Sequence, residues 1–203
     1  MCIRDRWCPV SSEVDPEEYY RKGLRTVLDD HVSMLSSSGF PAQLSDSAMD
    51  PGLYDLWRRA NVYAGYRYVA AADLVAGPDG VAGTATWTNF GVSSTHARWT
   101  IGYQLRDASG REVATSGSDV DLRTVDTEQA GGDEPAPATV SEPLAFSTDL
   151  APGTYTVSAV VSWDEHKPQA TRTVDFEPMN LAMPGRVDGA YPIGSVTIPA
   201  ATS

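Results

Sequence analysis

Few residues of this sequence have side chains suited to binding or proton transfer, and they lie far apart. The histidines are His31, His96 and His166. A histidine can exchange a proton near neutral pH and can hold a ligand through its ring nitrogens. We expect any ligand site on the C-terminal part to lie on loops around His96, His166 and Arg186. His31 has two interpretations, as a residue facing a cleft or as a structural histidine with satisfied hydrogen bonds.

The sequence lacks the motifs of common hydrolases and metal sites. It contains neither the GxSxG pattern of serine hydrolases nor the HExxH pattern of zinc proteases. Cys2 and Cys8 are the only cysteines, too few for a disulfide framework or a zinc site. Asp119, Asp121 and Asp126 could gather around a calcium ion, although solvated loop acids are the simpler interpretation. The sequence therefore predicts no metal and no cofactor.

The charge balance argues against two classes of partner. The 203 residues carry 15 basic and 27 acidic side chains, for a net charge of −12. Nucleic acids and anionic membrane surfaces attract clustered lysine and arginine, which this chain lacks. No window approaches the roughly 20 apolar residues of a membrane-spanning helix. We expect no nucleic-acid partner and no membrane span.

The N-terminal part is predicted to alternate strands and helices. Asp15 is suited to cap a helix starting at Pro16, because a carboxylate accepts free backbone N–H groups and proline fits the first turn. Strands alternating with helices indicate a parallel α/β arrangement, and two such units cannot close a sheet. The expected elements are a strand over Cys8–Ser12, a helix from Pro16 to about Asp29, a strand over His31–Leu35 and a helix from Pro51 to about Gly65.

From Tyr66 onward the sequence predicts only strands. Apolar and polar residues alternate, as in strands with one buried face, and turn residues separate the runs. Trp87, Trp99 and Trp163 alternate with polar neighbours, which predicts that all three rings point into the core. This pattern indicates an antiparallel β-sandwich of immunoglobulin-like or jelly-roll type. The expected strands span residues 66–75, 81–89, 97–106, 112–122, 139–146, 154–163, 171–176 and 190–198.

Two connecting segments of the predicted sandwich are distinctive. Ala151-Pro152-Gly153 is expected to form a corner before a central strand, because proline and glycine favour turns. Thr124–Ala138 is rich in glycine, proline and acidic residues, which predicts a mobile loop within the domain.

Several short segments, taken in order, resemble one group of proteins. This group consists of uncharacterised bacterial glycosidase-like proteins, in which a TIM-barrel region precedes a β-sandwich of unknown function. Pro9–Val14 (PVSSEV) and His31–Leu35 (HVSML) look like the last barrel segments. The segments that resemble the sandwich are GYRYV at Gly65–Val69, TWTNFG at Thr86–Gly91, LAPGTY at Leu150–Tyr155 and LAMPGRVDGAYPIGSVTI at Leu181–Ile198.

The resemblance implies a division of the chain. Residues 7–64 would be the last two βα units of a truncated (β/α)8 barrel, and residues 65–203 the β-sandwich domain. Residues 1–6, MCIRDR, resemble a peptide translated from sequencing-adapter DNA, so we expect them to be an artefact. The absence of a visible signal peptide then carries no information. The family resemblance implies a bacterial protein located outside the cell or at its surface.

The resemblance also implies a role for Glu13. If Cys8–Ser12 is strand 7 of the barrel, Glu13 lies at its C-terminal end, where active sites of TIM barrels form. Many retaining glycosidases carry their nucleophile there, with a general acid roughly 5 Å away that would come from an earlier strand. The family tends to have glycines where this chain has Ser11 and Ser12. The alternative interpretation of Glu13 is an exposed acid favoured by the dipole of the following helix.

Three functions are consistent with these observations. The first is the C-terminal fragment of a secreted glycoside-hydrolase-like protein, inactive by itself. Its sandwich would support the missing N-terminal barrel and act on or bind a polysaccharide or oligosaccharide. The second is an immunoglobulin-like binding or adhesion module that recognises a glycan or a protein through its loops. The third is a structural spacer.

Overall fold

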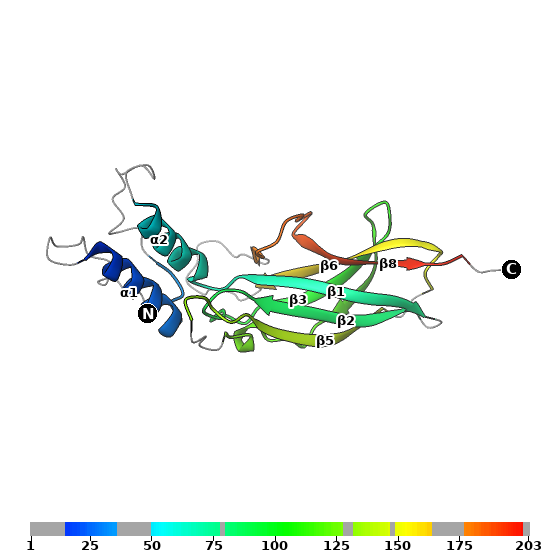
Figure 1. Ribbon diagram of the computed structural model, residues 1–203. Helices are drawn as coiled ribbons and strands as arrows, with labels where there is room; N and C mark the ends of the chain where they lie inside the picture. Colours follow the sequence, from blue (N-terminus) through cyan, green and yellow to red (C-terminus); the bar gives the residue numbers. More distant parts are fainter. Residues whose placement is uncertain are drawn as a thin grey trace, which may run out of the picture. The chain divides into compact units, whose positions relative to one another are not determined.

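A computed structural model describes residues 15–35, 50–77, 80–127, 132–146, 149–163 and 177–200. They form two compact units, each drawn from separate stretches of the chain (Figure 1). The helical unit comprises the described residues of Met1–Arg67, Asn89–Thr95 and Asp126–Ala138. The β unit comprises those of Tyr68–Thr88, His96–Val125 and Thr139–Ser203. The predicted domain boundary at residue 65 stays a prediction.

The two helices of the helical unit begin where their capping residues predict. α1 spans Pro16–Asp29, and the Asp15 carboxylate accepts a hydrogen bond of 3.0 Å from the backbone N–H of Glu17. α2 spans Pro51–Tyr63, and the Asp50 carboxylate accepts from two backbone N–H groups of its first turn. Both helices start with proline, whose missing N–H costs nothing in a first turn. Among the described residues, no helix is long and apolar enough to cross a membrane.

The helical unit has its own apolar core. The apolar side chains of α1 and α2 recur at helical spacing, so each helix has one apolar face. These two faces pack together in this core. Trp57 is half-buried against this core. The segment Asn89–Thr95 adds one buried apolar side chain to this core, Val92. The buried residues of the cluster are Tyr20, Leu24, Val27, Leu28, Val32, Leu56, Ala60 and Val92.

The prediction of a strand over His31–Leu35 is wrong. The segment is a turn and an irregular stretch that closes the end of α1. The backbone N–H of Val32 bonds back to the carbonyl of Val27, and the Val32 carbonyl accepts from Gly65. His31 has a positive φ of 49°, which is incompatible with an extended strand. The other strand of the predicted β-α-β-α pattern, Cys8–Ser12, lies outside the described residues.

The β unit consists of two antiparallel sheets, which confirms the prediction of a mainly β, sandwich-like structure (Figure 1). In the three-stranded sheet the order is β1 (Tyr68–Gly77), β2 (Gly80–Asn89) and β5 (Ala138–Phe146). In the five-stranded sheet it is β4 (Glu112–Gly117), β3 (Thr100–Arg106), β6 (Gly153–Trp163) and β7 (Glu177–Pro178), with β8 (Ala190–Ile198) also paired to β6.

Two details of the strand prediction need correction. The strand expected over residues 112–122 ends at Gly117, and a 3₁₀ turn, η2, follows at Leu122–Thr124. Asp121 explains this turn, because its carboxylate accepts from the backbone N–H of Arg123 and caps it. The strand expected over residues 171–176 lies outside the described residues.

The three tryptophans of the β unit differ in burial. Trp87 is fully buried, which confirms its predicted place in the core. Trp99 and Trp163 are half-buried, and their rings pack on each other with centroids 6.1 Å apart. They flank the last paired residues of β3 and β6, Thr100 and Ser162, so they occupy the end of the sheet and not its middle.

A tyrosine fixes the corner that Ala151-Pro152-Gly153 predicts. The Tyr155 hydroxyl, near the start of β6, donates a hydrogen bond of 2.8 Å to the carbonyl of Ala151. The ring is buried, so the bond spans from the core to the corner. Gly153 has a φ of 156°. A tyrosine that bonds back to the chain just before a central strand is a recurrent feature of immunoglobulin-like sandwiches.

We expect Tyr155→Phe to lower the free energy of unfolding by about 1 kcal/mol, because it deletes this hydrogen bond and keeps the ring. Urea unfolding followed by circular dichroism measures the change. A loss below about 0.3 kcal/mol would show that the corner does not depend on the hydroxyl.

Candidate functional site

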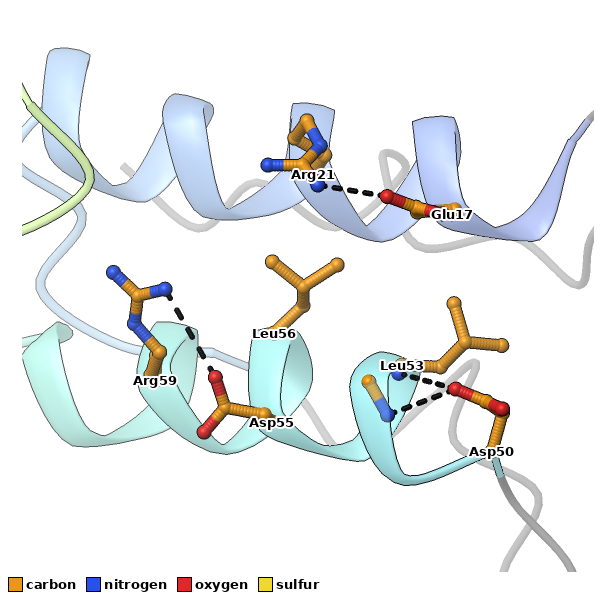
Figure 2. A pocket seen from close by; sticks show the side chains of 8 residues that line it. Glu17, Arg21, Asp50, Leu53, Asp55, Leu56 and Arg59 are labelled. Carbon is orange, nitrogen blue, oxygen red and sulfur yellow. Dashed lines mark hydrogen bonds and ion pairs between the residues drawn. The ribbon is translucent and has the colours of Figure 1, made fainter.

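A charged groove of about 280 Å³ lies between α1 and α2 in the helical unit (Figure 2). Leu56 points from α2 toward α1, and the charged side chains lie along both helices around it. The start of α2 closes one end, where Asp50 already binds the free backbone N–H groups. The lining residues are Glu17, Arg21, Asp50, Gly52, Leu53, Asp55, Leu56 and Arg59.

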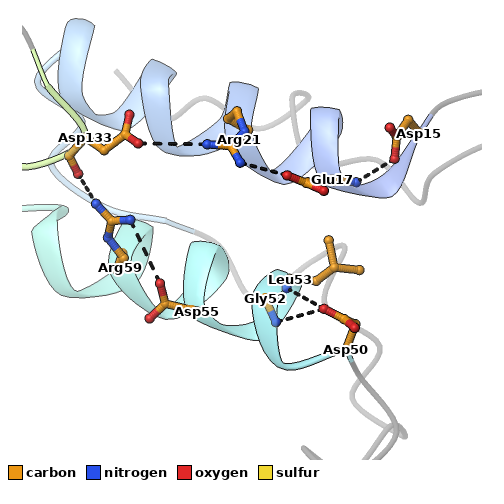
Figure 3. A network of polar contacts seen from close by, with 9 residues as sticks. All are labelled: Asp15, Glu17, Arg21, Asp50, Gly52, Leu53, Asp55, Arg59 and Asp133. Atoms are coloured by element: carbon orange, nitrogen blue, oxygen red, sulfur yellow. Dashed lines mark hydrogen bonds and ion pairs between the residues drawn. The ribbon is translucent and has the colours of Figure 1, made fainter.

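The charges of this groove bind one another and the segment around Asp133 (Figure 3). Arg21 pairs with Glu17 at 2.7 Å and lies 3.9 Å from the Asp133 carboxylate. Arg59 donates to the Asp133 carbonyl at 2.5 Å and lies 3.9 Å from Asp55. Thr124–Ala138 was predicted to be a mobile loop. At Asp133, one of its described residues, arginines of both helices hold it in place. We assign this network a structural role.

A second pocket of about 280 Å³ lies in the β unit, on the outer face of the five-stranded sheet. Side chains alternate across a strand, so Leu105 and Val157 point into the core while Arg106, Thr156 and Ser158 point outward. We call this the outer-face pocket. Its lining residues are Arg106, Asp107, Ala108, Gly110, Thr156, Ser158, Gly185, Val187, Ala190 and Pro192.

Strand register brings the parts of this pocket together. Arg106 of β3 pairs with Thr156 of β6, and Ser158 of β6 pairs with Pro192 of β8. The ladder between β6 and β8 shifts register just before Ser158. Such a bulge re-aims side chains next to it. Ser158 lines the pocket on the outer face, although only 5% of its surface is exposed.

A tight turn forms one edge of the pocket. Val187 and Ala190 exchange two backbone hydrogen bonds of 2.9 Å around Asp188 and Gly189. Both central residues have positive φ, 50° and 79°, which is the type I′ geometry that Asp-Gly favours. The turn holds Val187 at the pocket edge with 61% of its surface exposed. A large exposed apolar side chain on a rigid turn provides a preformed contact surface.

The two charged residues of the pocket are both engaged. Arg106 donates twice to the Gln104 side-chain oxygen, at 2.7 and 3.1 Å, and once to the Gly110 carbonyl. Asp107 accepts from Ser109 and Arg111. The Ser109 hydroxyl, followed by the backbone and side chain of Arg111, holds the pKa of Asp107 below its usual range. The pocket therefore has one polar side with fixed charges and one apolar side formed by Val187, Ala190 and Pro192.

Of the residues predicted to bind a ligand, Arg186 lies beside this pocket. Its neighbours Gly185 and Val187 line the pocket. Arg186 itself is exposed, donates to the Asn180 side chain at 2.6 Å and lies 5.8 Å from the centre of the Tyr191 ring. His96 is exposed in the β unit and does not line either pocket.

His31 lies in the helical unit and is half-buried. Its Nδ1 atom is 2.5 Å from the Val92 carbonyl and 3.7 Å from the Asp126 carboxylate. These contacts match the structural interpretation of this histidine, since they connect the end of α1 to two other segments of the unit.

Glu13 and His166 lie outside the described residues. Asp121 pairs with Arg123 at 2.5 Å, and the described residues contain no group of three metal-ligating side chains placed around a common point.

Comparisons with known proteins assign no family. No family model and no curated protein matches the sequence. Among solved structures, one described as the C-terminal domain of wzt is similar over 67% of this chain and 80% of its own, at 14% identity. The TM-score is 0.28. Superposition at this level does not establish a shared fold.

Sequence reasoning missed the residues of the outer-face pocket except for the neighbourhood of Arg186. Alternation identifies Thr156 and Ser158 as outward-facing, which was the available signal. It does not give the pairing of β3, β6 and β8, and only that pairing brings Arg106 and Pro192 to the same place.

Proposed function

We propose that this chain carries an accessory, non-catalytic β-sandwich module that binds a polysaccharide or oligosaccharide. The observation that carries the proposal is the outer-face pocket with its two unlike sides. A sugar ring has an apolar C–H face and a polar edge of hydroxyl groups. Val187 and Pro192 offer an apolar surface, while Thr156, Ser158 and Arg106 offer hydrogen bonds from rigid strands. Small-molecule sites combine an apolar lining with a few placed polar groups in this way.

The module is proposed to be of immunoglobulin-like type. Two observations support this assignment. The strand order β1-β2-β5 corresponds to the A-B-E group of that topology, and β3-β6-β8 corresponds to its C-F-G group. The Tyr155 hydrogen bond to Ala151 occupies the place of the tyrosine corner near the start of strand F.

The parent protein is proposed to be a secreted, glycoside-hydrolase-like enzyme, with this module outside the cell or at its surface. This part of the proposal rests on the sequence resemblance. α1 and α2 would be the last helices of the truncated barrel, and Glu13 its nucleophile. The segment His31–Leu35 weakens the barrel assignment because it is not a strand.

Removal of two hydroxyl groups tests the proposed site. A panel of soluble oligosaccharides is titrated into the full chain, and isothermal titration calorimetry measures the affinities. We expect at least one of these compounds to bind. The double variant Thr156→Val with Ser158→Ala should bind at least about tenfold more weakly, because two hydrogen bonds are lost. Thr154→Val is the matched control, since Thr154 lies on the same strand face outside the pocket and should leave affinity unchanged.

Two outcomes would contradict this assignment. Equal affinity of the wild type and the double variant would place the glycan elsewhere. If Trp99→Ala alone abolished binding, the aromatic pair at the end of β3 and β6 would be the site. Unfolding curves of each variant exclude loss of fold as the cause.

A protein partner is the second candidate, favoured by exposed apolar side chains in the helical unit. Met34 is 66% exposed and Phe90 45% exposed. Their segments both bond to the stretch 65–67, since the N–H of Gly65 donates to the Val32 carbonyl and the N–H of Phe90 donates to the Arg67 carbonyl. Exposed apolar groups that gather in one region often mark interaction surfaces. A Met34→Ser, Phe90→Ser variant should leave glycan binding unchanged if the first proposal holds.

A further inference from the structure

We infer that the outer-face pocket selects neutral sugar rings over acidic ones. The inference rests on the proposed function and adds the chemical class of the ligand. Three observations support it. Arg106 and Asp107 already bond to neighbouring groups, the charges around the pocket balance, and Val187 forms an exposed apolar edge.

One edge of the Arg106 guanidinium, formed by Nε and Nη2, is not available for a carboxylate. A bidentate carboxylate contact uses two parallel N–H groups along one edge of the planar guanidinium. Here the Nε and Nη2 groups both donate to the Gln104 oxygen, and Nη1 donates to the Gly110 carbonyl. The side formed by Nε and Nη2 is therefore occupied. Of the five N–H groups of an arginine, the two that remain, one on Nη1 and one on Nη2, can donate to hydroxyl or ring oxygens.

The neighbouring carboxylate discourages an anion further. Asp107 lines the same pocket and stays ionised, because Ser109 and Arg111 stabilise its charge. A ligand carboxylate placed at Arg106 would meet this like charge.

The charges around the pocket cancel. Arg106, Arg111 and Arg186 are matched by Asp107, by Asp188 in the turn and by Glu112, which pairs with Arg106 across β3 and β4. The whole chain has a net charge of −12, which repels polyanions at long range. An acidic polysaccharide thus gains no attraction at the site and meets repulsion on approach.

The apolar edge supplies the contact that a neutral ring needs. Val187 is 61% exposed and fixed by the Asp188-Gly189 turn, so it can cover the C–H face of a ring without ordering a loop. Ser158 lines the same pocket and is 5% exposed. Rigid contacts of this kind reduce the entropy lost on binding.

The test compares neutral gluco- and manno-oligosaccharides with oligosaccharides of uronic acids of equal length, titrated into the full chain. We expect the neutral compounds to bind at least about tenfold more tightly, a difference of about 1.4 kcal/mol. Their affinity should change less than about twofold between about 50 mM and about 500 mM NaCl, because no charge pair forms.

A variant of the apolar edge provides the second measurement. Val187→Ala should weaken binding of the neutral compounds about threefold or more, since it removes apolar contact area. Val75→Ala is the matched control, because Val75 is 68% exposed on β1 and does not line the pocket. It should bind like the wild type.

The outcomes distinguish a failure of the preference for neutral sugars from a failure of carbohydrate binding itself. Tighter, salt-sensitive binding of the uronic acids would overturn the inference and leave a carbohydrate-binding module. Neutral binding that Val187→Ala does not weaken would also overturn it. If neither class of oligosaccharide binds, the proposed function itself is wrong.

Discussion

Replacing Gly194 by alanine should lower the free energy of unfolding by about 3 kcal/mol, because the new methyl group has no room. Gly194 lies in β8 of the five-stranded sheet and approaches the backbone of β1 in the other sheet. A Cβ atom at this position would lie 2.5 Å from the Ala72 carbonyl oxygen and 3.3 Å from the Ala72 Cβ. Real side chains do not approach backbone atoms so closely, so β1 and β8 would have to separate.

Gly102 offers a matched control within the same sheet. It lies in β3, and a Cβ atom there would meet no other atom within 4 Å. Gly102→Ala should therefore be neutral or stabilise the protein by a few tenths of a kcal/mol, as expected for alanine in place of glycine in a strand. Urea unfolding monitored by circular dichroism measures both variants. Equal stability of the two variants would show that β1 and β8 do not approach as described.

Tyr103→Phe should lower the free energy of unfolding by about 3 kcal/mol, because its hydroxyl connects two groups, the buried Trp87 indole and the half-buried Glu142 carboxylate. The Tyr103 hydroxyl accepts from the Trp87 indole N–H at 2.7 Å and donates to the Glu142 carboxylate at 2.5 Å. Glu142 also accepts from the Ser118 hydroxyl and from the backbone N–H of Asp119. Without the tyrosine hydroxyl, the buried indole N–H loses its partner, and each such unsatisfied group costs roughly 1–3 kcal/mol.

Titration of the Tyr103 hydroxyl should make the free energy of unfolding depend on pH above about pH 10. Burial, with help from the bond to Glu142, raises the pKa of Tyr103 above its ordinary value near 10. Above about pH 10 the unfolded chain releases this proton while the folded protein keeps it. The unfolded state then binds fewer protons, so stability is complete below pH 10 and falls as pH rises, by up to about 1.4 kcal/mol per pH unit.

Phenylalanine at position 103 removes that titration. We expect the wild type and Tyr103→Phe to differ most near pH 8 and to converge as the pH approaches 11 and beyond. Unfolding free energies measured across this range test the prediction. A constant difference between the two proteins would show that Tyr103 titrates normally in the folded state. Ser118→Ala is a useful comparison, since it removes one donor to Glu142 and leaves the tyrosine hydroxyl in place.

Local chemistry allowed several elements to be predicted from the sequence. Asp15 and Pro16 define the start of α1 because capping involves only residues next to one another in the chain. The strands from Tyr68 to Ile198 follow from alternation, which also depends on local order. The corner at Ala151 was predictable from proline and glycine, although the hydrogen bond from Tyr155 was not.

Features that depend on distant residues were not predictable in this way. The strand over His31–Leu35 was wrong because an apolar alternation in five residues does not reveal the left-handed backbone of His31. Glu142 was not singled out from the sequence, because its bonds to Tyr103 and Ser118 depend on how the sheets pack. The outer-face pocket depends on strand register, which alternation leaves open.

The way the chain divides between its two units has a consequence for how such a protein can evolve. The chain passes from one unit to the other at residues 67–68, 88–89, 95–96, 125–126 and 138–139. The helical unit needs Val92 in its core, and Val92 is encoded between strands of the β unit. No single break in the gene separates the two units intact. They should therefore be gained, lost and duplicated together, and homologues that carry the sandwich should carry the helix pair with it.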